Sequence, residues 1–308
     1  MADIPASNWS ETDASNSSAS PDGMPEGMAP SGVNNTGRAI MGALKRFWNK
    51  TNAVKTTAGT TSAYTLTYDV APGAYYDGEI ISFVVNATNA AAATIDVNAL
   101  GAKALRLFGG NLLAGALITG QIVQARYGSA AGAFDIIPQN GWVVLGTATP
   151  SAAANADFPG IPAAVNNLML MLEIAPGTDG VNIGLQTYGA DGVLDTGASD
   201  YSSNQFRFTS TGTDSANQLT STFMILNYSG NAVDNGTFGF GGQITASNIQ
   251  SSTFTKFSGQ FHYLDSAGVG SVGVSIAGGR QEADRITGVR LITSSGTITG
   301  RVTLYGSV

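Results

Sequence analysis

The sequence contains no cysteine, and this absence removes a whole class of chemistry. Disulfides, thiolate metal sites and thiol nucleophiles are all excluded. The single histidine, His262, also excludes a histidine-rich metal site within one chain. Charged residues make up only 11% of the chain, against about 25% in a typical globular protein. Groups other than charges must therefore cover much of the surface.

Basic residues are also scarce. Lys and Arg number 14 against 21 Asp and Glu, which gives a net charge of −7. Proteins that bind nucleic acid contact the phosphates with clusters of Lys and Arg. The one concentrated basic patch here is short, and we expect no nucleic-acid partner. That patch consists of Arg38, Lys45, Arg46 and Lys50.

Long hydrophobic runs are missing as well. No stretch approaches the roughly 20 apolar residues that span a bilayer, so we expect no membrane insertion. Residues 1–20 have neither a basic region nor an apolar core, so no signal peptide is expected. A bacterial cytoplasm, or a virus assembled there, is the compatible setting.

What the sequence does contain is glycine, serine, threonine and asparagine. Glycine alone contributes 40 of the 308 residues. Such a surface suits β-strands and turns, and it is common where chains form intertwined oligomers. Hydrophobic residues are 43% of the chain, close to ordinary globular usage, and the length allows two or three domains.

Residues 21–50 differ from the β-rich remainder of the chain. They open with closely spaced turn formers, which predict an extended segment. A short helix of at most about four turns should follow, capped by Asn34 or Asn35 and too short to be stable alone. In the polar stretch before it, Trp9 is expected to occupy a pocket. The apolar face of the helix must pack on this chain or another subunit, and it comprises Ile40, Met41, Leu44, Phe47 and Trp48.

From residue 56 onward, short runs alternate apolar and polar residues between Gly, Asn, Asp or Pro turns. The predicted fold class is mainly β: an N-terminal segment with one short helix (1–55), a small antiparallel β-sandwich connector (56–140) and a jelly-roll-like β-sandwich head (141–308). Nine strands are predicted in the head, at 167–174, 181–188, 205–209, 222–228, 236–244, 253–263, 271–276, 286–293 and 298–305.

Four features follow one another in residues 9–48. They are a W-S-x-T-x-x-S-N stretch, a P-D-G-x-P-E-G motif, an A-P-S-x-V-N-N turn and the short helix. The series resembles the N-terminal segment of tail-fibre and virion-fibre proteins of tailed bacteriophages. The matching positions are Trp9, Ser10, Thr12, Ser15, Asn16, Pro21, Asp22, Gly23, Pro25, Glu26, Gly27, Met28, Pro30, Ser31, Val33 and Asn34.

A second resemblance covers residues 66–127. There, Y-x-D-G-x-x-x-x-F, N-x-L-G-A-K and G-Q-I-V occur in an order similar to that of a small β-module of phage fibre proteins. The two resemblances imply a virion-proximal anchor at the N-terminal end and a homotrimer. The implied anchor residues are Trp9, Pro21, Gly23, Pro25, Gly27, Pro30, Val33, Asn34, Ile40, Leu44, Phe47 and Trp48.

The expected function is that of a structural virion fibre or spike that displays its C-terminal β-domain for host-surface binding. The implied partners are other copies of the chain, other virion proteins (a tail or portal-proximal adaptor, or the capsid) and a host surface glycan or protein. The protein would then be located in the virion. Two alternatives stay open: a head fibre decorating the capsid, and a glycan depolymerase tailspike that would depend on Asp195 or Asp200.

Clustered carboxylates are the main candidates for chemistry. Asp191, Asp195 and Asp200 could form a glycosidase pair or a cation site. Each of them lies within two residues of Gly or Ser in a turn, however, where Asp commonly caps backbone amides. A second group is interpreted as a solvated, charge-compensated cluster at a loop or chain–chain contact: Arg280, Glu282, Asp284 and Arg285.

Three further patterns carry little chemical information. Gly268, Gly270 and Gly273 match G-x-G-x-x-G, but the residues that follow predict a strand where a dinucleotide site needs a helix. His262 has no partner that would make a triad. We expect no catalytic residue, metal or cofactor. Five aromatics could stack on sugars, although most should be core or interface: Tyr188, Tyr201, Phe254, Phe257 and Tyr263.

Overall fold

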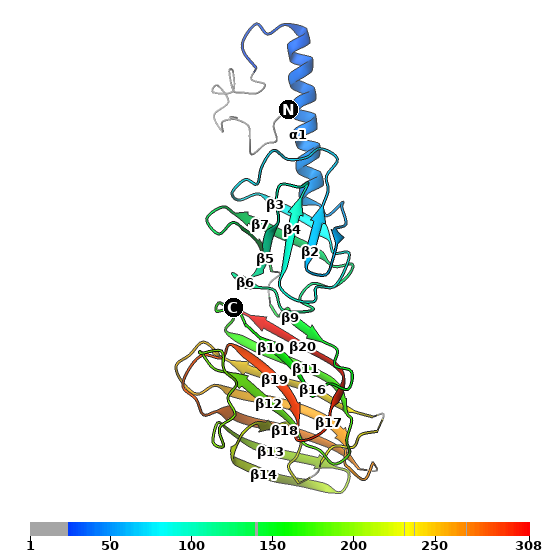
Figure 1. Ribbon diagram of the computed structural model, residues 1–308, viewed down its shortest axis with the longest axis vertical. Coiled ribbons are helices and arrows are strands. Elements are labelled where there is room, and N and C mark those ends of the chain that lie inside the picture. Colours follow the sequence, from blue (N-terminus) through cyan, green and yellow to red (C-terminus); the bar gives the residue numbers. More distant parts are fainter. Residues whose placement is uncertain (1–23, 139–140, 231, 237, 269) are drawn as a thin grey trace. The chain divides into compact units, whose positions relative to one another are not determined.

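The computed structural model describes residues 24–138, 141–230, 232–236, 238–268 and 270–308 (Figure 1). The chain forms two compact units, the first from residues 1–107 and 117–138 and the second from residues 108–116 and 139–308. Strands dominate both units, and one helix belongs to the first. The predicted mainly β class with sandwich-like domains is confirmed.

The helix α1 (Pro30–Thr51) is 22 residues long and begins earlier than expected. The prediction of a short helix capped by Asn34 or Asn35 was wrong. Pro30 lies in the first turn, and Ala29 precedes it in an extended conformation. Proline breaks a helix interior but suits the first turn, where its missing N–H would have no partner and its fixed φ is already helical.

The first unit is built on one mixed sheet. Its strands run in the order β1-β2-β4-β5-β8-β7-β3. The pairs β2–β4 and β5–β8 are parallel, whereas the other pairs along this path are antiparallel. The bounds are β1 (Ala58–Gly59), β2 (Ala63–Leu66), β3 (Ile80–Val84), β4 (Ala93–Val97), β5 (Lys103–Leu107), β7 (Ile122–Gly128) and β8 (Ala133–Ile136).

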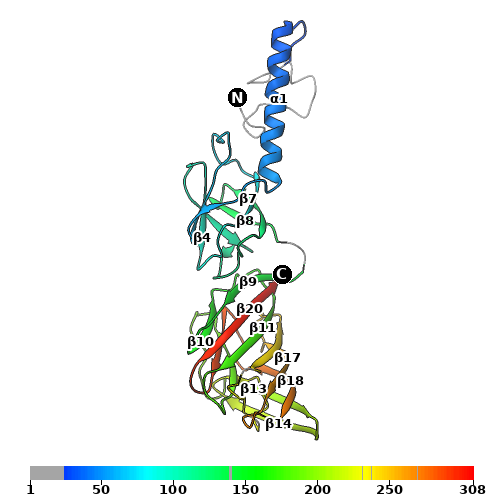
Figure 2. The ribbon, with the colours of Figure 1, turned by 90° about the vertical axis from the view of Figure 1, so that its right-hand side faces the viewer.

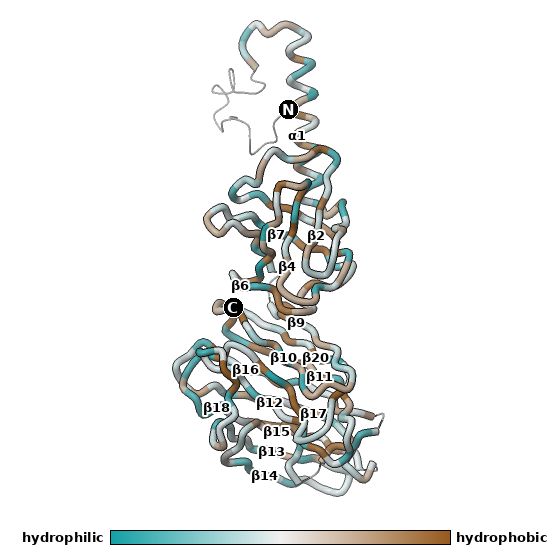
Figure 3. The backbone as a smooth tube through the Cα atoms, in the orientation of Figure 1, coloured by the Kyte–Doolittle hydropathy of each residue, from teal (hydrophilic) through white to brown (hydrophobic). Residues whose placement is uncertain are grey.

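Alternating side chains of these strands fill the core of the first unit. On β4 every second residue is buried, and on β7 Val123, Ala125 and Tyr127 are buried. Tyr127 packs with Tyr75 and Phe134, and the ring centroids of these three aromatics lie 5.2–5.4 Å apart. Hydrophobic segments accordingly lie on the strands and hydrophilic ones on several loops (Figure 3).

The second unit contains two antiparallel sheets. The larger has eight strands in the order β14-β13-β18-β17-β16-β11-β20-β9, and the smaller has the order β10-β19-β12-β15. Residues 108–116, with β6 (Gly110–Asn111), also belong to this unit. The bounds are β9 (Val143–Ala148), β10 (Asn155–Pro159), β11 (Asn167–Pro176), β12 (Ile183–Tyr188), β13 (Tyr201–Thr209), β14 (Gly212–Ser221), β15 (Met224–Ile225), β16 (Phe240–Ser247), β17 (Lys256–Leu264), β18 (Ser271–Arg280), β19 (Gly288–Thr293) and β20 (Ile298–Ser307).

Apolar side chains from the two sheets meet in the interior of the second unit. Leu170 on β11 and Leu304 on β20 lie with Leu185 on β12 and Val289 on β19 around one small internal space. All four are buried. In the larger sheet β20 and β11 lie side by side (Figure 2). Alternate residues of β11, and part of those of β20, are exposed on the outer face.

Three strands of the second unit were missed by the sequence patterns: β9, β10 and β14. β14 is the clearest case, because its residues are almost all polar and show no alternation. It is an edge strand that pairs only with β13. The predicted strand at 222–228 is reduced to the two residues of β15.

Candidate functional site

The predicted anchor residues lie on α1 and just before it. Trp9, Pro21 and Gly23 fall outside the described residues. Pro25 and Gly27 belong to an exposed turn ahead of the helix, where Gly27 has a φ of +70°. Among the predicted helical positions, Asn34 is exposed.

The large apolar side chains of α1 are turned toward solvent. Met41 is 71% exposed, Leu44 55% and Trp48 56%, although burying such side chains is favourable. The buried residues of the helix are instead Thr36, Ala39, Ala43 and Lys50. We call the large apolar side chains of the helix the apolar face of α1, of which Ile40 is half-buried and the other five are exposed: Val33, Ile40, Met41, Leu44, Phe47 and Trp48.

The apolar face of α1 follows a heptad pattern. Val33, Gly37, Ile40, Leu44 and Phe47 are separated by four, three, four and three residues, the spacing of a coiled-coil seam. The helix contains no acidic residue. Its basic residues lie away from this seam at Arg38, Lys45, Arg46 and Lys50.

The C-terminal end of α1 is fixed to the first sheet. Lys50 Nζ lies 2.7 Å from Glu79 Oε1, and both side chains are buried. Glu79 precedes β3, the strand that α1 contacts. Lys50 lies in the last turn of the helix, where a cation complements the helix dipole, and it also forms this buried ion pair with the β-domain.

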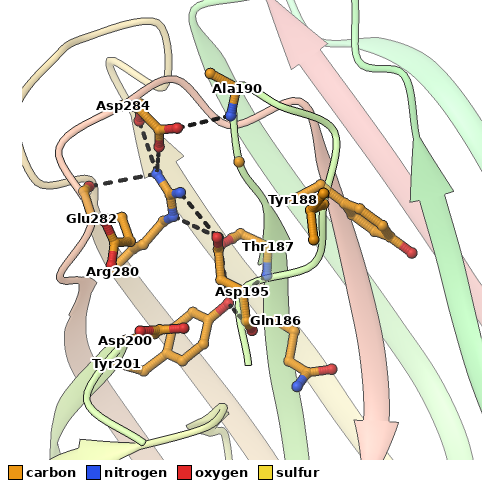
Figure 4. A network of polar contacts seen from close by, with 12 residues as sticks. Gln186, Thr187, Tyr188, Ala190, Asp195, Asp200, Tyr201, Arg280, Glu282 and Asp284 are labelled. Atoms are coloured by element: carbon orange, nitrogen blue, oxygen red, sulfur yellow. Dashed lines mark hydrogen bonds and ion pairs between the residues drawn. The ribbon is translucent and has the colours of Figure 1, made fainter. Parts of the chain in front are cut away.

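The charged cluster of the second unit is a buried network around Arg280 (Figure 4). Arg280 is 1% exposed, and its guanidinium donates to both carboxylate oxygens of Asp195, at 2.7 and 3.2 Å. It also pairs with the Asp284 carboxylate and donates to the Asp284 carbonyl. The prediction of a solvated cluster was wrong for Arg280, because its side chain is buried. The sequence did not indicate this burial, since the main partner, Asp195, is 85 residues away.

The neighbours of Arg280 stabilise its charge and neutralise it. Burial lowers the pKa of Arg280, but hydrogen bonds to Asp195 and Asp284 outweigh this effect and raise it overall. Burial also opposes ionisation of Asp284, yet the Ala190 amide and Arg280 lower the pKa of that carboxyl. Close by, burial raises the pKa of Tyr201 to about 12.

The remaining acidic candidates cap turns, as expected for Asp near Gly and Ser. Asp191 accepts a hydrogen bond from the Val193 amide at 2.9 Å, and Asp200 accepts one from the Gly197 amide. Asp195 accepts a hydrogen bond from Thr187 in addition to those from Arg280. In the described chain, no three carboxylate or histidine side chains converge as a metal site.

The other sequence candidates also have local structural roles. His262 Nε2 lies 2.7 Å from the hydroxyl of Ser271, and the ring packs edge-on against Phe238. The glycine motif leads into β18 rather than into a helix. Of the five aromatics, Tyr201, Phe257 and Tyr263 are buried in the core, Tyr188 is half-buried and only Phe254 is exposed.

Comparison of the chain with protein-family models, with curated proteins and with solved structures found no match. Within the described residues, no helix combines the length and hydrophobicity needed to cross a membrane.

Proposed function

We propose that this chain is a structural fibre or spike of a tailed-phage virion, attached through its N-terminal segment and displaying its second unit toward the host surface. The observation that carries the proposal is the apolar face of α1. Five of its six large apolar side chains are 45–71% exposed among the described residues, and the sixth, Ile40, is half-buried. Apolar surface of this kind typically marks an interaction site.

The sequence supports the same proposal. The motif series in residues 9–48 resembles phage fibre anchors, and it ends in this helix. A binding role rather than catalysis is supported by the acidic candidates, since Asp195 is held by Arg280, and Asp191 and Asp200 cap turns.

The assembly we propose is a homotrimer with α1 at its axis. The heptad positions Val33, Ile40, Leu44 and Phe47 would form the seam between parallel helices. Arg38, Lys45 and Arg46 lie off this seam, so identical charges are not brought together by the association. A fibre docked on the tail and one docked on the capsid share this design and differ only in the virion protein that they contact.

Single substitutions on α1 test the attachment role. Met41→Ser and Trp48→Ser replace exposed side chains that lie outside the proposed helix seam, so the β-domains and the oligomer should form normally. Incorporation into purified particles should fall by about fivefold or more because a buried apolar anchor contributes more than about 1 kcal/mol to binding. Immunoblots of purified particles measure this fraction.

The matched control for these variants is Lys45→Ser, which changes an exposed polar position on the same helix. It should incorporate as the parent chain does. Normal incorporation of both apolar-face variants would refute the attachment role. Imaging of particles with a C-terminal label would separate tail docking from capsid docking.

A further inference from the structure

The outer face of the eight-stranded sheet contains an open groove with a volume of about 520 Å³. This volume lies in the range of small-molecule sites. The groove crosses four neighbouring strands, β20, β11, β16 and β17. Its lining consists of Met171, Leu172, Glu173, Gly241, Gly242, Gln243, Gln260, Arg301, Thr303 and Tyr305.

The depth of the groove comes from a gap in the side chains of β16. Gly241 pairs in register with Glu173 on one side and with His262 on the other. Because it has no side chain, it leaves an opening between these two neighbours. Two residues along each strand, Gln243 lies between Met171 and Gln260 and forms the wall.

The polar side chains of the groove are not engaged with the protein. Among the described residues, Glu173, Gln243, Gln260, Arg301 and Tyr305 make no side-chain hydrogen bond or ion pair. Arg207, Arg280 and Arg290, elsewhere in the unit, instead bind carboxylates. The groove thus presents donors and acceptors that are free for a ligand.

The kinds of group in the groove select a ligand class. The two amides both donate and accept, the carboxylate accepts, and the guanidinium and phenol donate. Met171 and the ring of Tyr305 add apolar surface. This combination matches a sugar, whose hydroxyls alternate with apolar ring faces. Glu173 and Arg301 are register partners of opposite charge, so the groove carries no net charge and favours a neutral sugar.

Other ligand classes fit less well. A nucleic acid would need several basic residues, and the groove has only Arg301. An added peptide strand would need a free sheet edge, whereas β11, β16 and β17 are each paired on both sides. We therefore propose that this groove binds a short stretch of a neutral glycan. The biological meaning of the inference rests on the proposed host-facing role of this unit.

A matched pair of glycine substitutions tests the proposal on the full-length protein. Gly241→Leu fills the groove, and its site is open, because the nearest atom to an added Cβ is the Leu172 carbonyl oxygen at 3.7 Å. Gly273→Leu is the control, since Gly273 lies on the same face in register with His262 but outside the groove. Its nearest neighbour would be Phe208 Cβ at 3.8 Å.

The probes are immobilised neutral oligosaccharides of glucose, galactose, mannose, rhamnose and N-acetylhexosamines, with uronic-acid oligosaccharides alongside. The parent chain and Gly273→Leu should bind at least one neutral probe, and Gly241→Leu should weaken that binding by about tenfold or more. Three results would overturn the inference: no neutral probe is bound, only acidic probes are bound, or Gly241→Leu binds as the parent does.

Two further measurements distinguish the glycan site from a contact between copies of the chain and from the attachment role. Sedimentation of Gly241→Leu should give the same oligomeric mass as the parent; a changed mass would show that the face contacts another copy and would overturn the glycan site. Gly241→Leu should also enter particles normally. Absence of glycan binding with normal incorporation would refute the groove alone, whereas normal incorporation of the α1 variants would refute the attachment role alone.

Discussion

At the scale of single residues, the second unit contains a buried charged side chain that is neutralised by carboxylate partners. Arg280 is a fully buried guanidinium with two carboxylate partners, one of them contributed by a loop far away in sequence. A buried ion pair contributes little net free energy compared with an apolar core, but loss of one partner leaves a charge buried without compensation. Arg280 therefore connects the 189–200 loop, through Asp195, to the end of β18.

Removing the Arg280 charge should destabilise the second unit strongly. Arg280→Met leaves Asp195 and Asp284 without their shared partner, and the expected loss is about 3–5 kcal/mol. Arg301→Met is the control, because Arg301 is exposed and unpaired among the described residues, and it should change stability by less than about 0.5 kcal/mol. Denaturant unfolding followed by circular dichroism measures both. Equal stability of the two variants would contradict the role assigned to Arg280.

Two adjacent glycines on β16 should differ in how much stability is lost on substitution by alanine. Gly242 has a φ of +151°, and an added Cβ would lie 2.2 Å from the Gln260 carbonyl oxygen, so Gly242→Ala should cost about 1–3 kcal/mol. Gly241→Ala has open space and should stay within about 0.5 kcal/mol of the parent. Thermal unfolding of the two variants is the measurement. A tolerated Gly242→Ala would show that the backbone there is not constrained as described.

At the scale of elements, α1 combines a fixed end with an uncovered surface. Its last turns are held by the Lys50–Glu79 pair, while the apolar face remains exposed through the middle of the helix. An amphipathic helix is normally stabilised by packing of its apolar face. Most of the apolar face of α1 is exposed instead, and we propose that another subunit or virion protein covers it.

The Lys50–Glu79 pair should hold the end of α1 in place. Lys50→Met leaves the Glu79 carboxylate buried without this cation, and amide exchange in the last two turns of α1 should accelerate, corresponding to a loss of about 3 kcal/mol. Lys55→Met removes a pair with Asp69 that is exposed to solvent, and the expected cost is about 1 kcal/mol or less. Unchanged amide exchange in Lys50→Met would contradict this role and show that other contacts hold the end of the helix in place.

The sequence predicted elements well where one face is buried and poorly at their edges. β11, β17 and β20 show clear alternation and were expected close to their observed positions. β14 was missed because an edge strand with little apolar burial has no such period. The start of α1 was misplaced because Pro30 was interpreted as a turn former, although the same residue is favourable in the first turn of a helix.

At the scale of the whole molecule, the described residues form two β-cores and leave two notable surfaces uncovered by one another. These surfaces are the apolar face of α1 in the first unit and the polar groove of the larger sheet in the second. Residue spacing predicted the first surface. The second could not be foreseen, because the pairing of β20 with β11, whose residues are more than 100 positions apart, creates the groove.

The most direct test of the attachment role is to measure, in purified particles, whether the apolar face of α1 is covered. The oxidation rates of two methionines of the same chain can be compared. Met41 is 71% exposed on α1, and Met171 is 43% exposed on the outer face of the larger sheet. Oxidation of methionine by added peroxide follows its exposure. In the free oligomer both methionines should be oxidised, because Met41 lies outside the proposed helix seam. In intact particles without glycan, mass spectrometry should find Met171 oxidised and Met41 protected. Oxidation of Met41 at least as fast as that of Met171 would contradict the proposal that α1 is the attachment surface.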